Sequence, residues 1–205
     1  MAFFMKLVSV VLHPLLMATY LMIIFYFTLP ELFGAIGFNQ IPMLILATAL
    51  TTFIIPGAMM GLMRAFSKIT SVELSTREER FTPFMTITIF YGTTTYMFIN
   101  QFRLGGVFAI MMILVTCLIF ILALITLRFK ISIHAAANWS NTGILAFMLM
   151  NYSAAFFYPM IISALCSGLV CTSRLYQGLH TPREIWAGSI FGFGFCLLGL
   201  FLFGT

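Results

Sequence analysis

Long apolar runs, separated by short polar breaks, constrain this chain more than any other feature of its sequence. A helix needs about 20 mainly apolar residues to cross the hydrocarbon core of a bilayer, so runs of this length predict membrane-spanning helices. We place seven spans, at residues 4–29, 40–66, 83–101, 105–128, 134–155, 157–175 and 182–204. A membrane β-barrel would instead need segments of about ten residues with alternating polar and apolar positions, and the sequence does not contain them.

The composition supports the same conclusion. The chain is 62% hydrophobic and only 7% charged, whereas a soluble domain carries roughly a quarter of charged residues. We therefore predict an all-α, polytopic membrane helix bundle that forms one integral membrane domain over residues 1–205. The four cysteines form no CxxC pair, and we expect small buried apolar side chains at Cys117, Cys166, Cys171 and Cys196 rather than a disulfide or a metal site.

The ionisable residues are distributed unequally between the two faces that seven crossings create. The N-terminus and the second, fourth and sixth loops share one face. That face carries nine of the ten basic residues: Lys6, Arg64, Lys68, Arg77, Arg80, Arg128, Lys130, Arg174 and Arg183. It also carries His134, His180 and four of the five acidic residues. The positive-inside rule would make this face cytoplasmic, but that rule does not explain two histidines and a glutamate near helix starts.

Three loops on this face end in predicted helix starts. Thr82 before Pro83 and Ser132 before the fifth span are typical N-cap residues, and the run from Thr181 to Glu184 has the form of a capping box. Helix N-termini favour anions, because they carry unpaired N–H groups and the positive end of the helix dipole. The basic residues beside these starts are Arg77, Arg80, Lys130, Arg174 and Arg183. Since the forked guanidinium group suits phosphate, we predict a phosphate-binding site at this end of the bundle.

The polar residues of the fifth span recur at helical spacing. His134, Asn138 and Asn141 are expected to share one stripe that faces the interior of the bundle. Hydrogen bonds between helices would explain the two asparagines. Structural explanations also exist for Glu184, as a capping-box residue, and for His180, as an interfacial histidine. His13, beside Pro14 in the first span, is assigned no partner and no role.

The spacing of these residues resembles the signatures of the type-2 phosphatidic acid phosphatase superfamily. Its third signature, Ser-Arg-x5-His-x3-Asp, is similar to the run from Ser173 through Arg174 and His180 to Glu184. Its second, Pro-Ser-Gly-His, is matched in part by residues 131–134, and its first, Lys-x6-Arg-Pro, is matched loosely by "REERFTP", with Arg80 at the arginine. The resemblance covers roughly residues 68–190, which would form a phosphatase-like core of a divergent, bacterial-like member.

The resemblance implies metal-free hydrolysis of a phosphate ester, with no cofactor. His180 would attack phosphorus and form a phosphohistidine, Glu184 would orient that ring, and His134 would protonate the leaving alkoxide. Arg80 and Arg174 would hold the phosphate oxygens, helped by Ser132. The implied substrate is a membrane lipid phosphate or an isoprenyl diphosphate, and the implied location is the bacterial cytoplasmic membrane. Many bacterial relatives in this family act on the outer face of that membrane, whereas the loop charges of this chain favour a site on the cytoplasmic face.

The chain departs from the family pattern at several positions. Glu73 stands where the first signature has lysine, so that Arg77 or Lys130 would have to supply the missing charge. Ile133 replaces the glycine of the second signature, and Glu184 replaces the aspartate of the third.

Two other functions compete with a lipid phosphatase. The first is a metal-dependent intramembrane hydrolase that uses His134, His180 and Glu184 as ligands, although the sequence has no HExxH motif. The second is a protein that binds or transports an anion or a lipid phosphate without catalysis. The basic residues are dispersed along one membrane face without interleaved aromatic residues, which argues against nucleic acid as a partner.

Overall fold

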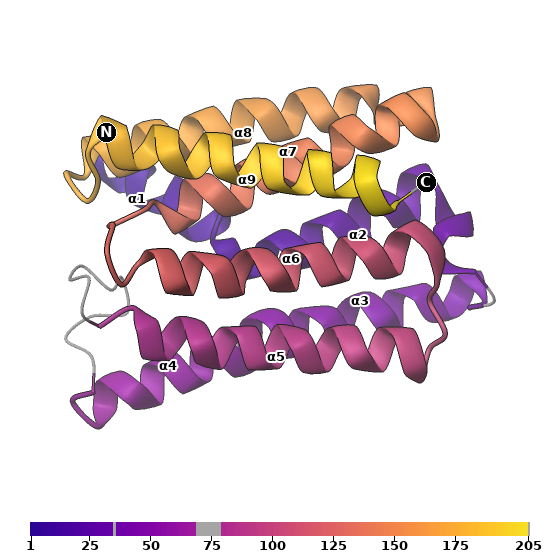
Figure 1. Ribbon diagram of the computed structural model, residues 1–205, viewed down its shortest axis with the longest axis horizontal. Helices are drawn as coiled ribbons and strands as arrows, with labels where there is room; N and C mark the ends of the chain where they lie inside the picture. The colour runs from indigo at the N-terminus through magenta and orange to yellow at the C-terminus, as the bar shows by residue number, and fades with distance from the viewer. Residues whose placement is uncertain (35, 69–78, 205) are drawn as a thin grey trace.

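The apolar runs form helices that lie side by side in one bundle (Figure 1). This computed structural model describes residues 1–34, 36–68 and 79–204. The α-helices in these ranges are α1 (Ala2–Val11), α2 (Met17–Thr28), α3 (Ile41–Ala49), α4 (Ile55–Ala65), α5 (Phe81–Asn100), α6 (Gly106–Ile125), α7 (Ile133–Asn151), α8 (Phe157–Tyr176) and α9 (Pro182–Phe203). The 3-10 turns are η1 (Pro14–Leu16), η2 (Pro30–Phe33), η3 (Phe38–Gln40) and η5 (Ala154–Phe156), and η4 (Leu50–Ile54) is a π-helical segment that joins α3 to α4. No strand occurs in the described ranges, so the predicted all-α fold is confirmed.

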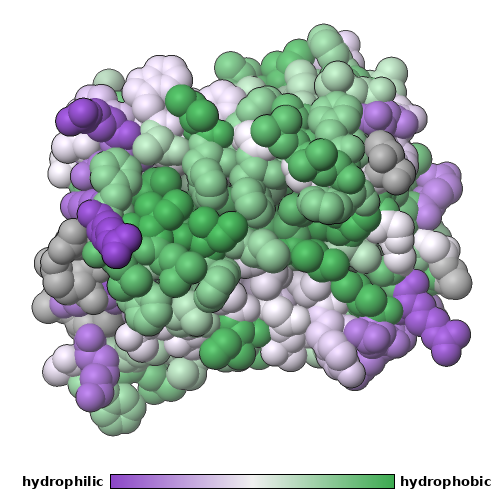
Figure 2. All heavy atoms as spheres, viewed as in Figure 1, coloured by the Kyte–Doolittle hydropathy of each residue, from purple (hydrophilic) through white to green (hydrophobic). Residues whose placement is uncertain are grey.

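Five helical segments are long and apolar enough to cross a membrane, namely Ala2–Thr28, Phe38–Ala65, Gly106–Ile125, Ala154–Tyr176 and Pro182–Phe203. The helices α5 and α7 run alongside them in the bundle (Figure 1) and carry several polar residues, mainly threonine in α5 and asparagine in α7. Apolar side chains cover the middle of the face shown in Figure 2, and hydrophilic side chains gather at its two ends. These features are those of an integral membrane protein.

The helix starts that the sequence analysis singled out lie at one end of the bundle. The starts of α5, α7 and α9 are at the same end as the N-terminus, and the C-terminus lies at the opposite end (Figure 1). This arrangement agrees with an odd number of passes along the bundle. It also places the loops before α7 and α9 next to each other.

Helix α7 forms the centre of the part of the bundle that carries the site. It packs most extensively against α9 and α8, and more than half of its residues are buried, including Asn138 and Asn141. Two glycines of α9 allow this close approach. A Cβ atom on Gly188 would lie 2.5 Å from the carbonyl oxygen of Ser132, and one on Gly192 would collide with the backbone of Ala136. These two glycines therefore permit the tight packing of α9 against α7.

The first predicted span is not one continuous helix, because Pro14 has no N–H group and interrupts the helical ladder. In an unbroken helix, the N–H groups of Leu15 and Leu16 would donate to the carbonyls of residues 11 and 12. Here they donate to Nδ1 and to the carbonyl oxygen of His13, at 3.3 and 2.9 Å. Helix α1 consequently ends at Val11, and the chain resumes through η1 into α2.

Side chains from elsewhere bond to the backbone carbonyls around this break. The hydroxyl of Tyr20 donates to the Val11 oxygen at 2.7 Å, and Nδ2 of Asn138 donates to the Leu12 oxygen at 3.1 Å. About one turn further along α7, Nδ2 of Asn141 donates to the Met17 carbonyl oxygen at 3.0 Å. Because backbone polar groups inside a membrane must be satisfied within the protein, these bonds stabilise the break. They also confirm the interhelical role proposed for the two asparagines.

Two further sequence predictions need correction. Helix α5 begins at Phe81 with Arg80 at its N-cap, so Thr82 is not the cap and Pro83 is not the first residue. Proline fits at the third position because the N–H groups of the first turn have no partner within the helix. Of the cysteines, Cys196 is buried as expected, but Cys117 is exposed on the outside of the apolar helix α6.

Candidate active site

The loop between α8 and α9 is fixed by the caps of both helices. At the end of α8, Gly178 has a φ of 66° and donates to the Leu175 carbonyl at 3.0 Å, while Leu179 N–H donates to the Arg174 carbonyl at 3.2 Å. These two bonds form a Schellman motif, in which the position with positive φ favours glycine. His180 follows directly, and Thr181 then caps α9 in the predicted capping box, which is confirmed. The short loop therefore has little freedom, and it holds His180 between the two helices.

Glu184 is hydrogen-bonded to His180 in addition to its role in the capping box. Its Oε2 atom lies 2.8 Å from Nδ1 of His180 and accepts from the Thr181 N–H at 3.2 Å. The His180 side chain is 2% exposed and that of Glu184 is 15% exposed. Since a carboxylate can only accept, Nδ1 carries the proton in the neutral ring and the lone pair is on Nε2.

The surroundings of His180 keep its ring neutral. Burial lowers the pKa of His180 from 6.5 to about 4; the hydrogen bond to Glu184 opposes this shift, and the charges of Arg80 and Arg174 add to it. At neutral pH the Nε2 lone pair is therefore available to act as a nucleophile or base.

Two arginines from other elements are buried at the same end of the bundle. Arg80, at the start of α5, is 3% exposed, and its Nη1 donates to the Ile131 carbonyl at 3.1 Å. Burial lowers the pKa of Arg80, an effect that Glu184 counteracts, but a guanidinium group remains protonated in proteins. Arg174, in the last turn of α8, is 4% exposed. Both residues therefore bring a fixed positive charge into a region of low polarity.

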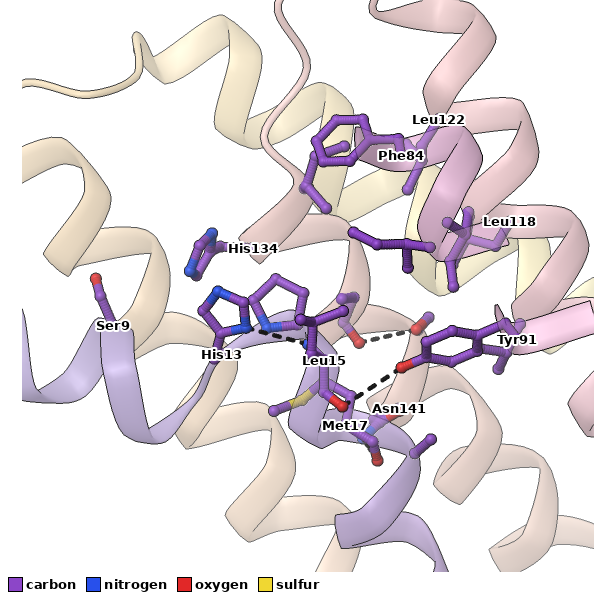
Figure 3. Close-up of a pocket in the computed structure, with 18 of the residues that line it drawn as sticks. Ser9, His13, Leu15, Met17, Phe84, Tyr91, Leu118, Leu122, His134 and Asn141 are labelled. Carbon is purple, nitrogen blue, oxygen red and sulfur yellow. Dashed lines mark hydrogen bonds between the residues drawn. The ribbon is translucent and has the colours of Figure 1, made fainter. Parts of the chain in front are cut away.

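A cavity of about 250 Å³ connects these residues with the apolar interior of the bundle. Its polar lining is Ser9, His13, Arg80, His134, Ser140, Asn141, Arg174 and His180. The apolar lining includes Leu15, Met60, Phe84, Ile87, Tyr91, Val115, Leu118, Ile119 and Leu122. In Figure 3 the rings of His13 and His134 lie next to each other, and Phe84, Tyr91 and two leucines of α6 lie on the other side of the cavity. The described lining thus combines two arginines with a large apolar surface, which suits an anion attached to an apolar group.

The structure brings most of the predicted site residues together at one cavity. Four of them, Arg80, His134, Arg174 and His180, line this cavity, and Glu184 contacts it through His180.

Ser132 does not line the cavity: its side chain caps α7 by accepting from Ala135 N–H at 3.4 Å, and its own N–H donates to the Glu184 carbonyl at 3.2 Å. It ties the start of α7 to that of α9. Lys130 is not among the lining residues. Arg77 and Glu73 lie outside the described residues.

His13 lines the cavity, although it was not among the predicted site residues. Its ring centroid lies 5.3 Å from that of His134, with the two rings at 85° in an edge-to-face arrangement. An ionisable residue inside a membrane span is by default a candidate functional residue, and this signal was available in the sequence. The position of its partner, 121 residues further along the chain, was not.

The metal-site hypothesis receives no geometric support. Within residues 1–34, 36–68 and 79–204, no three His, Cys, Asp or Glu side chains are grouped closely enough to hold a metal ion. The three proposed ligands have different neighbours. His180 is hydrogen-bonded to Glu184, whereas His134 packs edge-to-face against His13.

No family model matches this chain, and no match was found among curated proteins or among solved structures.

Proposed function

We propose that this protein is a membrane phosphatase that hydrolyses a lipid phosphate or an isoprenyl diphosphate through a phosphohistidine intermediate. One observation carries the proposal. A neutral histidine, His180, is hydrogen-bonded to a carboxylate and lines the same cavity as Arg80 and Arg174. A histidine oriented by a carboxylate, next to two fixed positive charges, is well suited to nucleophilic attack on a phosphate.

The proposed reaction has two steps. Nε2 of His180 attacks phosphorus, a P–N bond forms, the P–O bond to the lipid breaks, and His134, which enters this step in its protonated form, donates a proton to the leaving oxygen and becomes neutral. Water then attacks phosphorus while His134 takes a proton from it, the P–N bond breaks and inorganic phosphate leaves. During both steps Arg80 and Arg174 neutralise the phosphate oxygens, and Glu184 stabilises the positive charge that develops on the His180 ring.

The apolar part of the cavity supports a substrate with a hydrocarbon chain. Phe84, Ile87 and Tyr91 of α5 face Leu118 and Leu122 of α6 around it. The volume of about 250 Å³ is close to the lower end of the roughly 300–1,000 Å³ of typical small-molecule sites. A free sugar phosphate would gain nothing from this lining, whereas the first carbons of a lipid chain would bury apolar surface there.

The resemblance to the type-2 phosphatidic acid phosphatase superfamily favours the same reaction. The geometry of the loop gives a physical reason for the spacing in its third signature. The five residues between Arg174 and His180 contain the Schellman turn, and the three between His180 and Glu184 form the first turn of α9. We accordingly place the protein in a bacterial cytoplasmic membrane, as the resemblance implies.

A phosphate-release screen tests the proposal. The purified protein in detergent would be given phosphatidic acid, phosphatidylglycerol phosphate and polyprenyl diphosphate, beside the His180→Ala variant. Arg183→Ala is the matched control, because Arg183 is an exposed residue in the same turn. We expect release from at least one lipid by the wild type and the control, and none by His180→Ala. Phosphate binding without release from any lipid would instead favour a non-catalytic binding or transport protein.

A further inference from the structure

The break in the first span orients His13. Its Nδ1 atom accepts from the Leu15 N–H at 3.3 Å and thereby caps η1. The hydrogen bonds from Tyr20 and Asn138 to the carbonyls at the end of α1 hold the chain in this bent path. Hydrogen bonds from three residues, Leu15, Tyr20 and Asn138, therefore hold the segment that carries the His13 ring in its bent path.

The bond to Leu15 determines which nitrogen of His13 carries the proton. Nδ1 acts as an acceptor, so the neutral ring is protonated on Nε2. In Figure 3 this second nitrogen is on the side of the ring that faces His134, away from Leu15. His13 is thus a fixed hydrogen-bond donor, since protonating Nδ1 would remove the cap of η1.

The neighbours of His13 are the residues that the proposed reaction uses. Its ring is 5.3 Å from that of His134, and both rings line the cavity with Arg80, Arg174 and His180. A phosphate held by these residues would lie within the same polar part of the cavity. The two arginines give this part of the cavity a positive charge, which favours an anion as the ligand that the Nε2–H donor would meet there.

We propose that His13 is a third histidine of the active site, whose Nε2–H donates a hydrogen bond to an oxygen of the bound phosphate group. This inference rests on the proposed phosphatase function for its catalytic consequence. His13 differs from His134 in its role: His134 transfers a proton, whereas His13 keeps its proton and stabilises charge on oxygen. A donor fixed in advance costs no reorganisation when the negative charge moves, and removing one such donor lowers kcat by roughly 10²–10³-fold.

Two substitutions separate this role from simple capping. His13→Asn keeps an oxygen that can accept from Leu15 N–H, since asparagine is a good N-cap residue, but it lacks a donor at the position of Nε2. His13→Gln is longer and can place an amide N–H near that position. We expect His13→Asn to melt within a few degrees of the wild type and to lose about 10²-fold in kcat, and His13→Gln to regain part of that loss. If His13→Asn does not fold, His13→Ser is the second cap-retaining variant.

A binding measurement distinguishes failure of this inference from failure of the proposed function. Orthovanadate, which mimics the transition state of phosphoryl transfer, would be titrated calorimetrically into the wild type, His13→Asn, His13→Gln and Arg183→Ala. We expect His13→Asn to bind vanadate at least about tenfold more weakly than the other three, a difference of one good hydrogen bond to a charged group.

The outcomes are separable. If the wild type releases phosphate and His180→Ala does not, but His13→Asn matches the wild type in kcat and in vanadate affinity, the role of His13 is wrong and the phosphatase stands. If the wild type hydrolyses no lipid, the proposed function is wrong, and vanadate decides the role of His13 alone. Weaker binding by His13→Asn then supports an anion-binding role, and equal binding, or no binding by the wild type, overturns it.

Discussion

Three of the hydrogen bonds that Glu184 makes serve two purposes. Its N–H and its carboxylate complete the capping box with Thr181, at 3.4 and 3.2 Å, and the same carboxylate oxygen bonds to Nδ1 of His180 at 2.8 Å. The residue is therefore both a helix cap and the partner of the proposed nucleophile. The longer arm of glutamate, compared with aspartate, reaches back over one helical turn to do both.

Replacing Glu184 by glutamine should separate these two purposes. Glutamine can also complete a capping box, so we expect the melting temperature of Glu184→Gln to change little. Its amide cannot stabilise the positive charge on His180, and loss of such a carboxylate lowers kcat by up to about 10⁴-fold. The measurement is kcat beside thermal unfolding for the same preparation. A variant with wild-type kcat would show that Glu184 is a cap and nothing more.

The pKa of His180 predicts how stability depends on pH. The folded protein holds this pKa at about 4, against 6.5 for an unperturbed histidine. Below pH 6.5 the unfolded chain takes up a proton that the folded state resists, so the free energy of unfolding falls as the pH falls from 6.5 to about 4, by on the order of 3 kcal/mol in total. Above pH 6.5 the ring is neutral in both the folded and the unfolded protein, so this residue adds no pH dependence to the free energy of unfolding.

Thermal unfolding of the wild type and His180→Gln, compared at about pH 7.5 and about pH 4.5, isolates this contribution. His180→Gln lacks the titrating ring and should lose less stability between the two values. An equal loss in both proteins would contradict a buried neutral His180.

Hydrogen bonds from α7 maintain the broken path of the first span. Asn138 is buried and donates to the Leu12 carbonyl, which the break leaves without its usual helical partner. A straight α1–α2 helix would carry His13 in a different direction. The polar stripe of α7 therefore stabilises the break between α1 and α2 in addition to lining the cavity.

Asn138→Ala should therefore destabilise the protein by about 1 kcal/mol, the usual size of an interhelical hydrogen bond in a membrane protein. Asn151→Ala is the matched control, because Asn151 lies on the same helix, is exposed, and bonds to the Phe147 carbonyl of its own helix. We expect a lower melting temperature for Asn138→Ala than for the control. The reverse order would show that the break does not depend on α7.

The contact between α7 and α9 gives a second prediction for an element. Gly192→Ala would place a methyl group against the Ala136 backbone, so α9 would have to move away, at a cost of about 1–3 kcal/mol. Gly194→Ala, two residues further on, meets nothing within 4 Å and should melt as the wild type or slightly higher. Similar melting temperatures for the two variants would contradict the close packing of these helices.

Across the whole molecule, the sequence correctly predicted those features that depend on residues close to one another along the chain. The apolar runs predicted the helices, and the Thr181 capping box and the Ser132 cap were correct because each depends on a few adjacent residues. Pro83 misled the prediction of the α5 start, since proline is tolerated throughout the first helical turn. The pairing of His13 with His134 could not be predicted, because it depends on bonds from distant residues such as Asn138 to a broken backbone.

The central claim is that phosphate is transferred to His180, and trapping the intermediate tests it most directly. The protein would be mixed with a lipid phosphate that it hydrolyses and quenched in base, in which phosphohistidine survives, and its peptides would then be analysed by mass spectrometry. We predict a phosphoryl group on the peptide that contains His180 in the wild type and in Arg183→Ala, and none in His180→Ala. Turnover without a phosphorylated peptide, and unchanged in His180→Ala, would contradict the proposed mechanism.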